Sequence, residues 1–401
     1  MSVSSPPVIV SLNAIAVRLP RDLKSATGSA GSPSKLQEGE FAYRWSSTVK
    51  ALYSTYFETC LVKVVLSDGS VGWGEAQAPL APRVAATIVE DLLRPVLIGQ
   101  TFDGTRERIE FLWDEMYASM RVRGQTGGFM LDAMAGVDIA LWDLAGQLRA
   151  LPVSKLIAGV LAKSSVPAYL SGLTGASVDH KVEFAEKHYK SGFRLFKLFH
   201  DSDAASLLEL LDKLRERLGA DAKFAVDALW RFEPEAAAAF GLELDRRKAY
   251  WFEAPLMPEG VMDHKDLADS LQTPLALGES YRTIFEMEQF FENHVFQFLQ
   301  PDLGRTGITG GLRLAMRAAA LGMEVVPHVS IAMAPQIAAA IHFAAAAPAC
   351  HICEFNPAVV EIANRYSPQP IVMENARYSI SESPGLGVSI FEESLRRDIV
   401  R

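Results

Sequence analysis

From Val166 onward the chain alternates short apolar runs with longer segments of helical period. Short apolar runs bounded by glycine, proline or charged residues are typical of parallel strands that are buried on both faces. They predict strands at 166–171, 194–199, 223–227, 249–253, 274–278, 296–301, 323–328 and 351–355. Eight βα units are the number at which a parallel barrel closes. The pattern therefore predicts a (β/α)8-type barrel over residues 151–375.

The first 150 residues have a different pattern. A strand is predicted at 8–18, and strands at 59–66 and 71–75 flank an Asp68-Gly69 turn, which is a strong hairpin signal. Three helical segments follow, at 84–93, 105–120 and 128–148. Strands followed by helices indicate an α+β domain. A Gly/Ser/Pro-rich stretch at 26–34 predicts a mobile loop, and we expect the tail, 376–401, to pack back onto this first domain.

Three carboxylates follow successive barrel strands at equal intervals. Asp227, Glu253 and Glu279 are 26 residues apart (253 − 227 and 279 − 253), and each ends an apolar run. The carboxyl ends of barrel strands form the face on which active sites are built. Carboxylates that converge there would repel one another unless a hard cation neutralised them, and Mg²⁺ prefers oxygen ligands. The spacing therefore predicts one Mg²⁺ ion bound by these three residues.

Composition narrows the class of protein. The 401 residues carry a net charge of −9, with no basic run, which argues against a nucleic-acid surface. Three cysteines (Cys60, Cys350 and Cys353) suit a reducing compartment, and one CxxC pair without further ligands indicates neither zinc nor a disulfide framework. The N-terminus lacks the features of a signal peptide, and the apolar stretch at 331–348 reads as a buried helix. We expect a cytoplasmic protein with no membrane partner.

Several strings, taken together, resemble one known family. In the first domain they are Asp68-Gly69, Gly72-Trp73-Gly74-Glu75 and residues 133–144; in the barrel they are Gly192-Phe193-Arg194, Lys197, the three carboxylates, Gln300-Pro301-Asp302 and Pro327-His328. The chain resembles the mandelate racemase/muconate lactonizing enzyme branch of the enolase superfamily over nearly its whole length. The resemblance implies a capping α+β domain whose mobile loop closes over a modified TIM barrel. It also implies a small carboxylic-acid substrate and a homo-oligomer, a dimer or an octamer.

The resemblance implies catalysis by a Lys or His base, with Mg²⁺ stabilising an enediolate. A proton alpha to a carboxylate is weakly acidic, and a divalent cation on the carboxylate oxygens supplies positive charge where the new negative charge develops. Asp302 and His328, 26 residues apart (328 − 302), resemble the family's dyad, in which the aspartate orients the imidazole. An imidazole in such a dyad can remove the proton and then protonate a leaving hydroxide.

The second barrel strand departs from the family pattern. Lys197 matches the first lysine of the usual Lys-x-Lys pair, but Phe199 stands at the second, usually catalytic position. Lys197 points into the barrel and is expected either to bind substrate or to act as a displaced base. His200 has the opposite parity and should face the helices, which makes a catalytic role the less favoured alternative.

Other residues are expected near the substrate. Glu354 lies where the family has an acid that hydrogen-bonds the substrate carboxylate, and a salt bridge at the barrel end is the equal alternative. Tyr281 and Arg282, just after Glu279, are candidate substrate contacts. Arg44, with Trp45 and Lys50, follows the predicted loop and is a candidate for substrate specificity.

The asymmetry between His328 and Phe199 favours one reaction. A racemase needs bases on both faces of the carbon, whereas loss of water from a dihydroxy acid needs one base and one acid, and one histidine can serve as both. The sequence thus predicts an acid-sugar dehydratase that forms a 2-keto-3-deoxy acid. The alternatives are a racemase or epimerase that uses Lys197 or His200, and an inactive metal-binding relative.

Overall fold

The computed structural model describes residues 5–20, 42–47, 50–200 and 203–400. The mobile loop predicted at 26–34 lies outside these residues. The N-terminal part contains a three-stranded antiparallel sheet, β1 (Ile9–Pro20), β4 (Tyr56–Leu66) and β5 (Val71–Ala76), in the order β1-β4-β5. The predicted hairpin joins β4 and β5, and Gly69 takes a φ of 89° in its turn. A separate ribbon pairs β2 (Tyr43–Ser46) with β3 (Ala51–Ser54).

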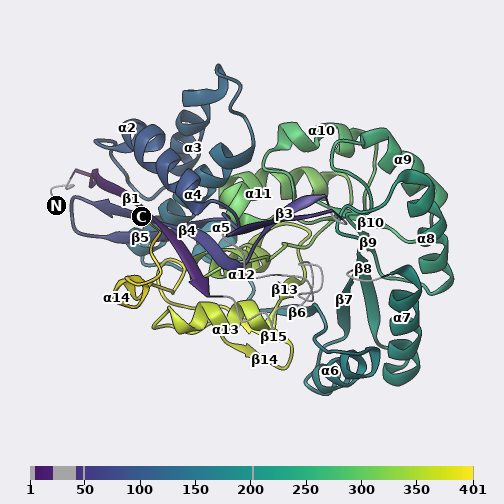
Figure 1. Cartoon of the computed structure of the whole chain (residues 1–401). Coiled ribbons are helices and arrows are strands. Elements are labelled where there is room, and N and C mark those ends of the chain that lie inside the picture. The colour runs from purple at the N-terminus through teal and green to yellow at the C-terminus, as the bar shows by residue number, and fades with distance from the viewer. Residues whose placement is uncertain (1–4, 21–41, 48–49, 201–202, 401) are drawn as a thin grey trace.

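Helices cover one face of the three-stranded sheet (Figure 1). They are α1 (Pro82–Thr87), the π-helix η2 (Ile88–Leu93), α2 (Arg94–Leu97), α3 (Arg106–Arg121) and α4 (Gly128–Arg149). Two glycines of β5 allow α4 to approach closely: a Cβ on Gly72 would lie 2.4 Å from the Ala140 carbonyl oxygen, and a Cβ on Gly74 would lie 1.9 Å from that of Gly136. This close packing explains why strand β5 alternates glycine with larger residues.

The larger sheet closes into a barrel. Its parallel strands are β6 (Ser165–Ser171), β7 (Leu195–Phe199), β8 (Lys223–Asp227), β9 (Phe252–Glu253), β10 (Leu275–Leu277), β11 (Phe298–Leu299), β12 (Glu324–Val325) and β13 (Cys353–Phe355). Closure comes from β13, which pairs with β6, and from a bridge between Val325 and Cys350. The barrel helices are α6 (Val178–Lys190), α7 (Ala204–Leu218), α8 (Pro234–Arg246), α9 (Val261–Ser270), α10 (Ile284–Glu292), α11 (Leu303–Ala320), α12 (Ala334–Ala346) and α13 (Pro357–Arg365). The predicted fold class is confirmed.

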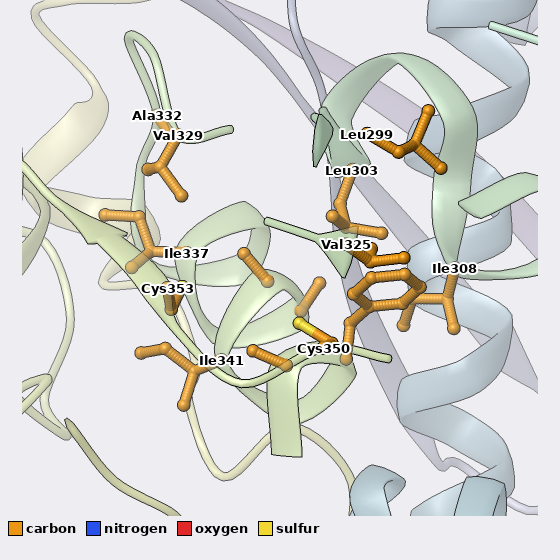
Figure 2. Packing of buried hydrophobic residues seen from close by; sticks show 14 of the residues in the cluster. Leu299, Leu303, Ile308, Val325, Val329, Ala332, Ile337, Ile341, Cys350 and Cys353 are labelled. Carbon is orange, nitrogen blue, oxygen red and sulfur yellow. The ribbon is translucent and has the colours of Figure 1, made fainter. Parts of the chain in front are cut away.

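The outer core fills the space between strands and helices. Figure 2 shows part of it, where Leu299 and Val325 of β11 and β12 pack with Leu303 and Ile308 of α11 and with Ile337 of α12. All three cysteines are free and buried, as expected for packing residues. None of the helices in the described part of the chain is long and apolar enough to cross a bilayer.

The inner core decides which residues reach the barrel mouth. Seven buried residues form one layer inside the barrel: Tyr169, Leu195, Ala225, Trp251, Ala276, Phe298 and Val326. Side chains two positions apart on a strand share a face. The residues two positions further along are Ser171, Lys197, Asp227, Glu253, Gly278, Gln300 and His328. The strand period therefore brings most of the expected site residues to the same end of the barrel.

The C-terminal segment contacts both halves of the molecule. Helix α5 (Val153–Ala158) and the short η3 (Gly159–Leu161) connect the N-terminal domain to the barrel. After the last barrel helix, the chain forms a hairpin of β14 (Met373–Glu374) and β15 (Arg377–Ser379). Strand β15 pairs antiparallel with β6. Beyond α14 (Glu392–Leu395), Ile399 bridges to Val17 of β1. The segment thus begins on the barrel and ends on the N-terminal sheet.

Candidate active site at the barrel mouth

A cavity of about 450 Å³ opens at the carboxyl ends of the barrel strands. Asp227 and Glu253 end β8 and β9, lie opposite each other in the strand register, and are buried. Glu279 follows the positive-φ residue Gly278, where a Cβ would lie only 2.6 Å from the backbone of Gln300. This glycine turns the chain after β10 so that Glu279 enters the cavity wall.

The three carboxylates are crowded. Burial and the charges of Glu253 and Glu279 raise the pKa of Asp227 well above its usual value, although Lys197 partly opposes this shift. A cation placed among these oxygens would remove the repulsion, so the donor set fits a hard divalent ion. Among the described residues, ligand atoms of Glu253, Glu279 and His328 lie within 4.8 Å of one another. This group contains His328 in place of Asp227 of the expected triad; Asp227 Oδ1 accepts the Leu229 N–H at 2.9 Å, and Oδ2 lies 3.7 Å from Lys197 Nζ.

Lys197 lies beneath this cluster and is fully buried. Its Nζ is 2.7 Å from Glu253 Oε1, 3.0 Å from Glu354 Oε1 and 3.7 Å from Asp227 Oδ2. Burial acts to lower the pKa of this ammonium, but the charges of Glu253 and Glu354 outweigh it and raise the pKa well above its usual value. A lysine held protonated among carboxylates neutralises charge and is not available as a base.

His328 lies between two carboxylates. Its Nδ1 donates to Asp302 Oδ2 at 2.8 Å, and its Nε2 lies 2.8 Å from Glu279 Oε2. Asp302 is itself fixed as the N-cap of α11, where Oδ1 accepts from the Gly304 N–H and from Gln336 Nε2, each at 2.9 Å. With Asp302 held on both oxygens, the imidazole orientation is set and Nε2 is directed toward the cavity.

The charge state of the imidazole follows from these neighbours. Burial acts to lower the pKa of His328, but the charges of Glu279 and Glu354 and the hydrogen bond to Asp302 raise it well above its usual value. Glu279 shows the reverse: burial acts to raise its pKa, and the His328 charge lowers it to about 2. The two groups therefore form an ion pair, and Nε2 and a divalent cation draw on the same Glu279 oxygens.

The end of β7 contributes an apolar side chain to the cavity lining. Phe199 lines the cavity, and its ring centroid is 5.4 Å from Lys197 Nζ. His200 faces the other way, as its parity predicts, with its ring edge-on to Phe232 and Phe240 between strand and helix. Neither position places a free base on this part of the lining.

Glu354 lines the cavity from β13 but is committed to other groups. One oxygen pairs with Lys197, and the other accepts the Val329 N–H at 2.8 Å. Burial acts to raise the pKa of Glu354, but the charges of Lys197 and His328 lower it. An ionised acid cannot donate to a substrate carboxylate, so the geometry favours the salt-bridge alternative.

The structure places Tyr281 and Arg282 outside the cavity lining. The Tyr281 hydroxyl donates to the Pro258 carbonyl oxygen at 2.7 Å. The Arg282 guanidinium binds both oxygens of Asp132 on α4, at 3.0 and 3.2 Å, and so links the barrel to the N-terminal domain. Sequence proximity to Glu279 predicted substrate contact, but the turn after Glu279 directs both side chains to structural partners.

The β2–β3 ribbon approaches the cavity from above the mouth. Lys50 and Tyr53 line it, and Arg44 lies opposite Tyr53 in the register, on the same face of the ribbon. Trp45 pairs with Leu52 on the other face, where both are more than half exposed. Arg44 itself is not part of the cavity lining.

Several residues of the cavity lining were not predicted from the sequence, among them Trp230, Gln77 and Arg305. Trp230 donates from Nε1 to Glu279 Oε1 at 2.7 Å. It follows Leu229, and both have a φ near +55°, a conformation that non-glycine residues seldom adopt unless the surrounding structure imposes it. No periodic pattern marks such a turn, and the other two residues approach the mouth only through the packing of the two domains.

Comparisons with known proteins agree with this architecture of a capped barrel with converging carboxylates. The chain matches the family described as "Enolase C-terminal domain-like" over residues 181–394 and "Mandelate racemase / muconate lactonizing enzyme, N-terminal domain" over residues 49–158. The chain therefore belongs to the mandelate racemase/muconate lactonizing enzyme branch of the enolase superfamily.

Individual relatives differ in the reactions for which they are named. The arabinonate dehydratase of Saccharolobus solfataricus is 29% identical over 89% of this chain and 95% of its own. The D-galactarolactone cycloisomerase of Agrobacterium fabrum is 30% identical over 84% and 89%. A solved enolase-superfamily structure from Agrobacterium tumefaciens superposes with a TM-score of 0.90, at 30% identity, over 99% of both chains. The relatives share the fold and include both dehydratases and cycloisomerases.

Proposed function

We propose that this protein dehydrates an acid sugar to a 2-keto-3-deoxy acid, with His328 as the base and then the acid. The observation that carries the proposal is the one-sided site. His328, held by Asp302, lines the cavity beyond β12, whereas Phe199 lines it at the end of β7, three strands away around the barrel. A single imidazole that alternates between base and acid suffices for loss of water, and does not suffice for racemisation by two bases.

The proposed metal is one Mg²⁺ ion held by Asp227, Glu253 and Glu279. When bound, it would stabilise the negative charge that develops on the substrate carboxylate as the alpha proton leaves. The crowding that raises the pKa of Asp227 supports a cation at this position. We retain Asp227 in place of His328 as the third ligand, because Mg²⁺ prefers carboxylate oxygen to imidazole nitrogen.

The residues of this chain would act in a fixed order. With a cation held by Glu279 in place of the proton shared in the His328–Glu279 ion pair, Nε2 would become free and neutral. The Nε2 of His328 then takes the C2 proton, and the C–H electron pair moves toward the carboxylate to give an enediolate. Asp302, on Nδ1, stabilises the imidazolium that forms. The electron pair then returns to form the C2–C3 double bond, and the C3 hydroxyl leaves as water after it takes the proton from Nε2. The resulting enol tautomerises to the 2-keto acid.

Lys197 and Trp230 would support the site without taking part in proton transfer. Lys197 offsets the charge of Glu253 and Glu354, so that the cluster tolerates burial. Trp230 orients Glu279 through its indole N–H. Neither transfers a proton in this scheme.

Cycloisomerisation is the second candidate, because it begins with the same proton transfer. In that reaction the oxygen expelled from the neighbouring carbon belongs to a ring, so the product is an isomer and no water is lost. The one-sided site serves this reaction equally well, and a 30% identical relative is named for it. The nature of the leaving oxygen separates the two candidates.

The test is a panel of aldonic acids, aldaric acids and their lactones incubated with the Mg²⁺-loaded protein. Dehydration predicts a 2-keto acid product 18 mass units lighter than the substrate, with one solvent deuterium incorporated at C3 when the reaction is run in D₂O. A product of unchanged mass from a lactone would favour cycloisomerisation. Exchange of deuterium into both epimers of one acid, without loss of water, would overturn both readings and support an epimerase.

A further inference from the structure

A polar corner of the cavity lies where the N-terminal domain meets the barrel. Gln77 follows strand β5, and its backbone N–H donates to the Gly304 carbonyl oxygen at 2.9 Å. Arg305 is the next residue, in the first turn of α11. Both side chains line the cavity. The docking of one domain on the other therefore brings an amide and a guanidinium together at the same corner.

The Gln77 side chain is enclosed without a partner. It is only 2% exposed, and among the described residues its Oε1 accepts no hydrogen bond. Leaving a buried amide oxygen unpaired costs about 1–3 kcal/mol, so such groups are rare without a ligand or water to satisfy them. The unpaired oxygen belongs to a side chain of the cavity lining, and a small rotation of the amide would let it accept from a hydroxyl group of a bound molecule.

Arg305 also has a buried polar atom without a hydrogen-bond partner, in this case a donor. Its Nε is buried and donates to no described residue. Its nearest carboxylate is Asp132, 3.9 Å from Nη1, and Asp132 already binds Arg282 through both oxygens. The other cation of the lining, Lys50, is more than half exposed and lies 3.7 Å from Glu233. Lys50 is paired with Glu233 at the surface, whereas the carboxylate beside Arg305 is shared with Arg282, which holds both of its oxygens.

We propose that Arg305 and Gln77 bind the far end of a dicarboxylic sugar acid, an aldaric acid or its monolactone. The planar guanidinium binds the second carboxylate, because its paired N–H groups match two carboxylate oxygens. The Gln77 oxygen accepts from the hydroxyl next to that carboxylate. The inference rests on the proposed function, which uses the first carboxylate at the Asp227, Glu253 and Glu279 cluster. A monocarboxylic aldonic acid would leave Arg305 unpaired.

The test compares acids that differ only at the far end, galactarate against galactonate and glucarate against gluconate. The wild-type kcat/KM should favour the diacid of the accepted configuration by at least about tenfold, since charge-assisted hydrogen bonds are the stronger ones. Arg305→Met should lower kcat/KM for the diacid by about 100-fold, mainly through KM, and for the monoacid by less than about threefold. Arg305→Lys keeps the positive charge but lacks the paired N–H groups of the guanidinium. Its kcat/KM for the diacid should therefore lie between those of wild type and Arg305→Met.

Arg282→Met is the matched control, since Arg282 contacts the same aspartate from outside the cavity. We expect it to lower Tm and to change kcat/KM for both acids in equal proportion. The inference would be overturned if the wild-type enzyme did not prefer diacids, or if Arg305→Met lowered kcat/KM for the diacid and the monoacid equally. Either result would leave the dehydratase proposal standing.

Binding separates the inference from the proposed reaction. If no acid is turned over, galactarate and galactonate are each titrated into the Mg²⁺-loaded wild-type and Arg305→Met proteins, and Tm is followed. Stabilisation by galactarate that is lost in Arg305→Met supports the diacid corner even without dehydration. Equal stabilisation of both proteins, or of neither, counts against it.

Discussion

Two sets of carboxylates in this protein, all buried except the partly exposed Glu279, have opposite surroundings. Glu75, Asp138 and Asp143 lie where the N-terminal domain contacts the barrel and the C-terminal segment; Asp227, Glu253 and Glu279 lie at the barrel mouth. The first set accepts hydrogen bonds from neutral groups. The second set pairs with Lys197 and His328, and two of its members, Asp227 and Glu279, line the cavity.

The interface carboxylates are enclosed by backbone donors and hydroxyls. Glu75 accepts from the N–H groups of Met333 and Gln336, at 2.7 and 3.2 Å, at the start of α12. Burial is the largest influence on each of the three, and it raises the pKa of Glu75 to about 7, that of Asp138 to about 6 and that of Asp143 to about 7. Neutral donors offset burial only in part, so these groups bind a proton at a higher pH than exposed carboxyl groups do.

Burial alone does not distinguish the proposed metal ligands from carboxylates that hold the domains together. Both sets contain buried carboxyl groups with shifted pKa values. The sets differ in the charge of their neighbours and in access to a cavity, because Lys197 and His328 lie beside the mouth set, and Asp227 and Glu279 line the cavity. A search by pKa shift alone would rank Glu75 and Asp143 beside Asp227.

The largest expected effect is a loss of turnover when the site at the barrel mouth is changed and the domain interface is left intact. His328→Asn keeps a polar group beside Asp302 but removes the proton-transfer group, so kcat should fall by about 1,000-fold or more. Circular dichroism and Tm should stay close to wild type, because no interface bond is lost. Near-normal turnover on the best acid of the panel would remove His328 from its proposed role.

The next largest effect is a loss of stability when the domain interface is changed and the site at the barrel mouth is left intact. Asp138 accepts from the Thr309 N–H at 2.9 Å and from its hydroxyl at 2.5 Å, so Asp138→Ala leaves buried donors unsatisfied. The free energy of unfolding should fall by about 2–3 kcal/mol, while kcat at 25 °C changes by less than about threefold. Chemical denaturation followed by tryptophan fluorescence measures the loss, with Asp138→Asn as the milder control.

A smaller effect is expected on the affinity of the barrel mouth for Mg²⁺. Trp230→Phe removes the indole N–H that orients Glu279, and loss of such a partner weakens metal binding by about tenfold. Calorimetric titration with Mg²⁺ measures this change. Trp251→Phe provides a contrast, since its indole N–H donates to Glu253 Oε2 at 2.8 Å from below the cluster. Unchanged Mg²⁺ affinity in Trp230→Phe would limit Trp230 to a packing role.

The smallest expected effect is a pH dependence of the interface. The folded-state pKa of Glu75 is raised from 4.5 to about 7, so its stabilising contribution is fully present below pH 4.5 and is lost as pH rises through 7. Glu75→Gln should therefore remove at least about 1 kcal/mol of the decline in stability across this range. Parallel curves for the two proteins, from denaturation at several pH values, would show that Glu75 does not titrate in this way.

The sequence predicted the mouth better than the interface, for physical reasons. Strand periodicity determines which residues share the inner face, so Lys197, Asp227, Glu253 and His328 could be placed from spacing alone, and His200 could be turned outward. Loop geometry has no such period, which is why Tyr281 and Arg282 were expected in the cavity. Gln77 and Arg305 lie 228 positions apart (305 − 77), and only the docking of two domains brings them together.

The central claim is that the mouth carboxylates form a cation site and the interface carboxylates do not. Calorimetric titration of Mg²⁺ into wild type, Glu253→Gln and Glu75→Gln at one pH tests it most directly. The account predicts one bound ion in wild type and in Glu75→Gln, and none at the same concentrations in Glu253→Gln. An ion retained with full affinity by Glu253→Gln, or lost in Glu75→Gln while the fold persists, would contradict it.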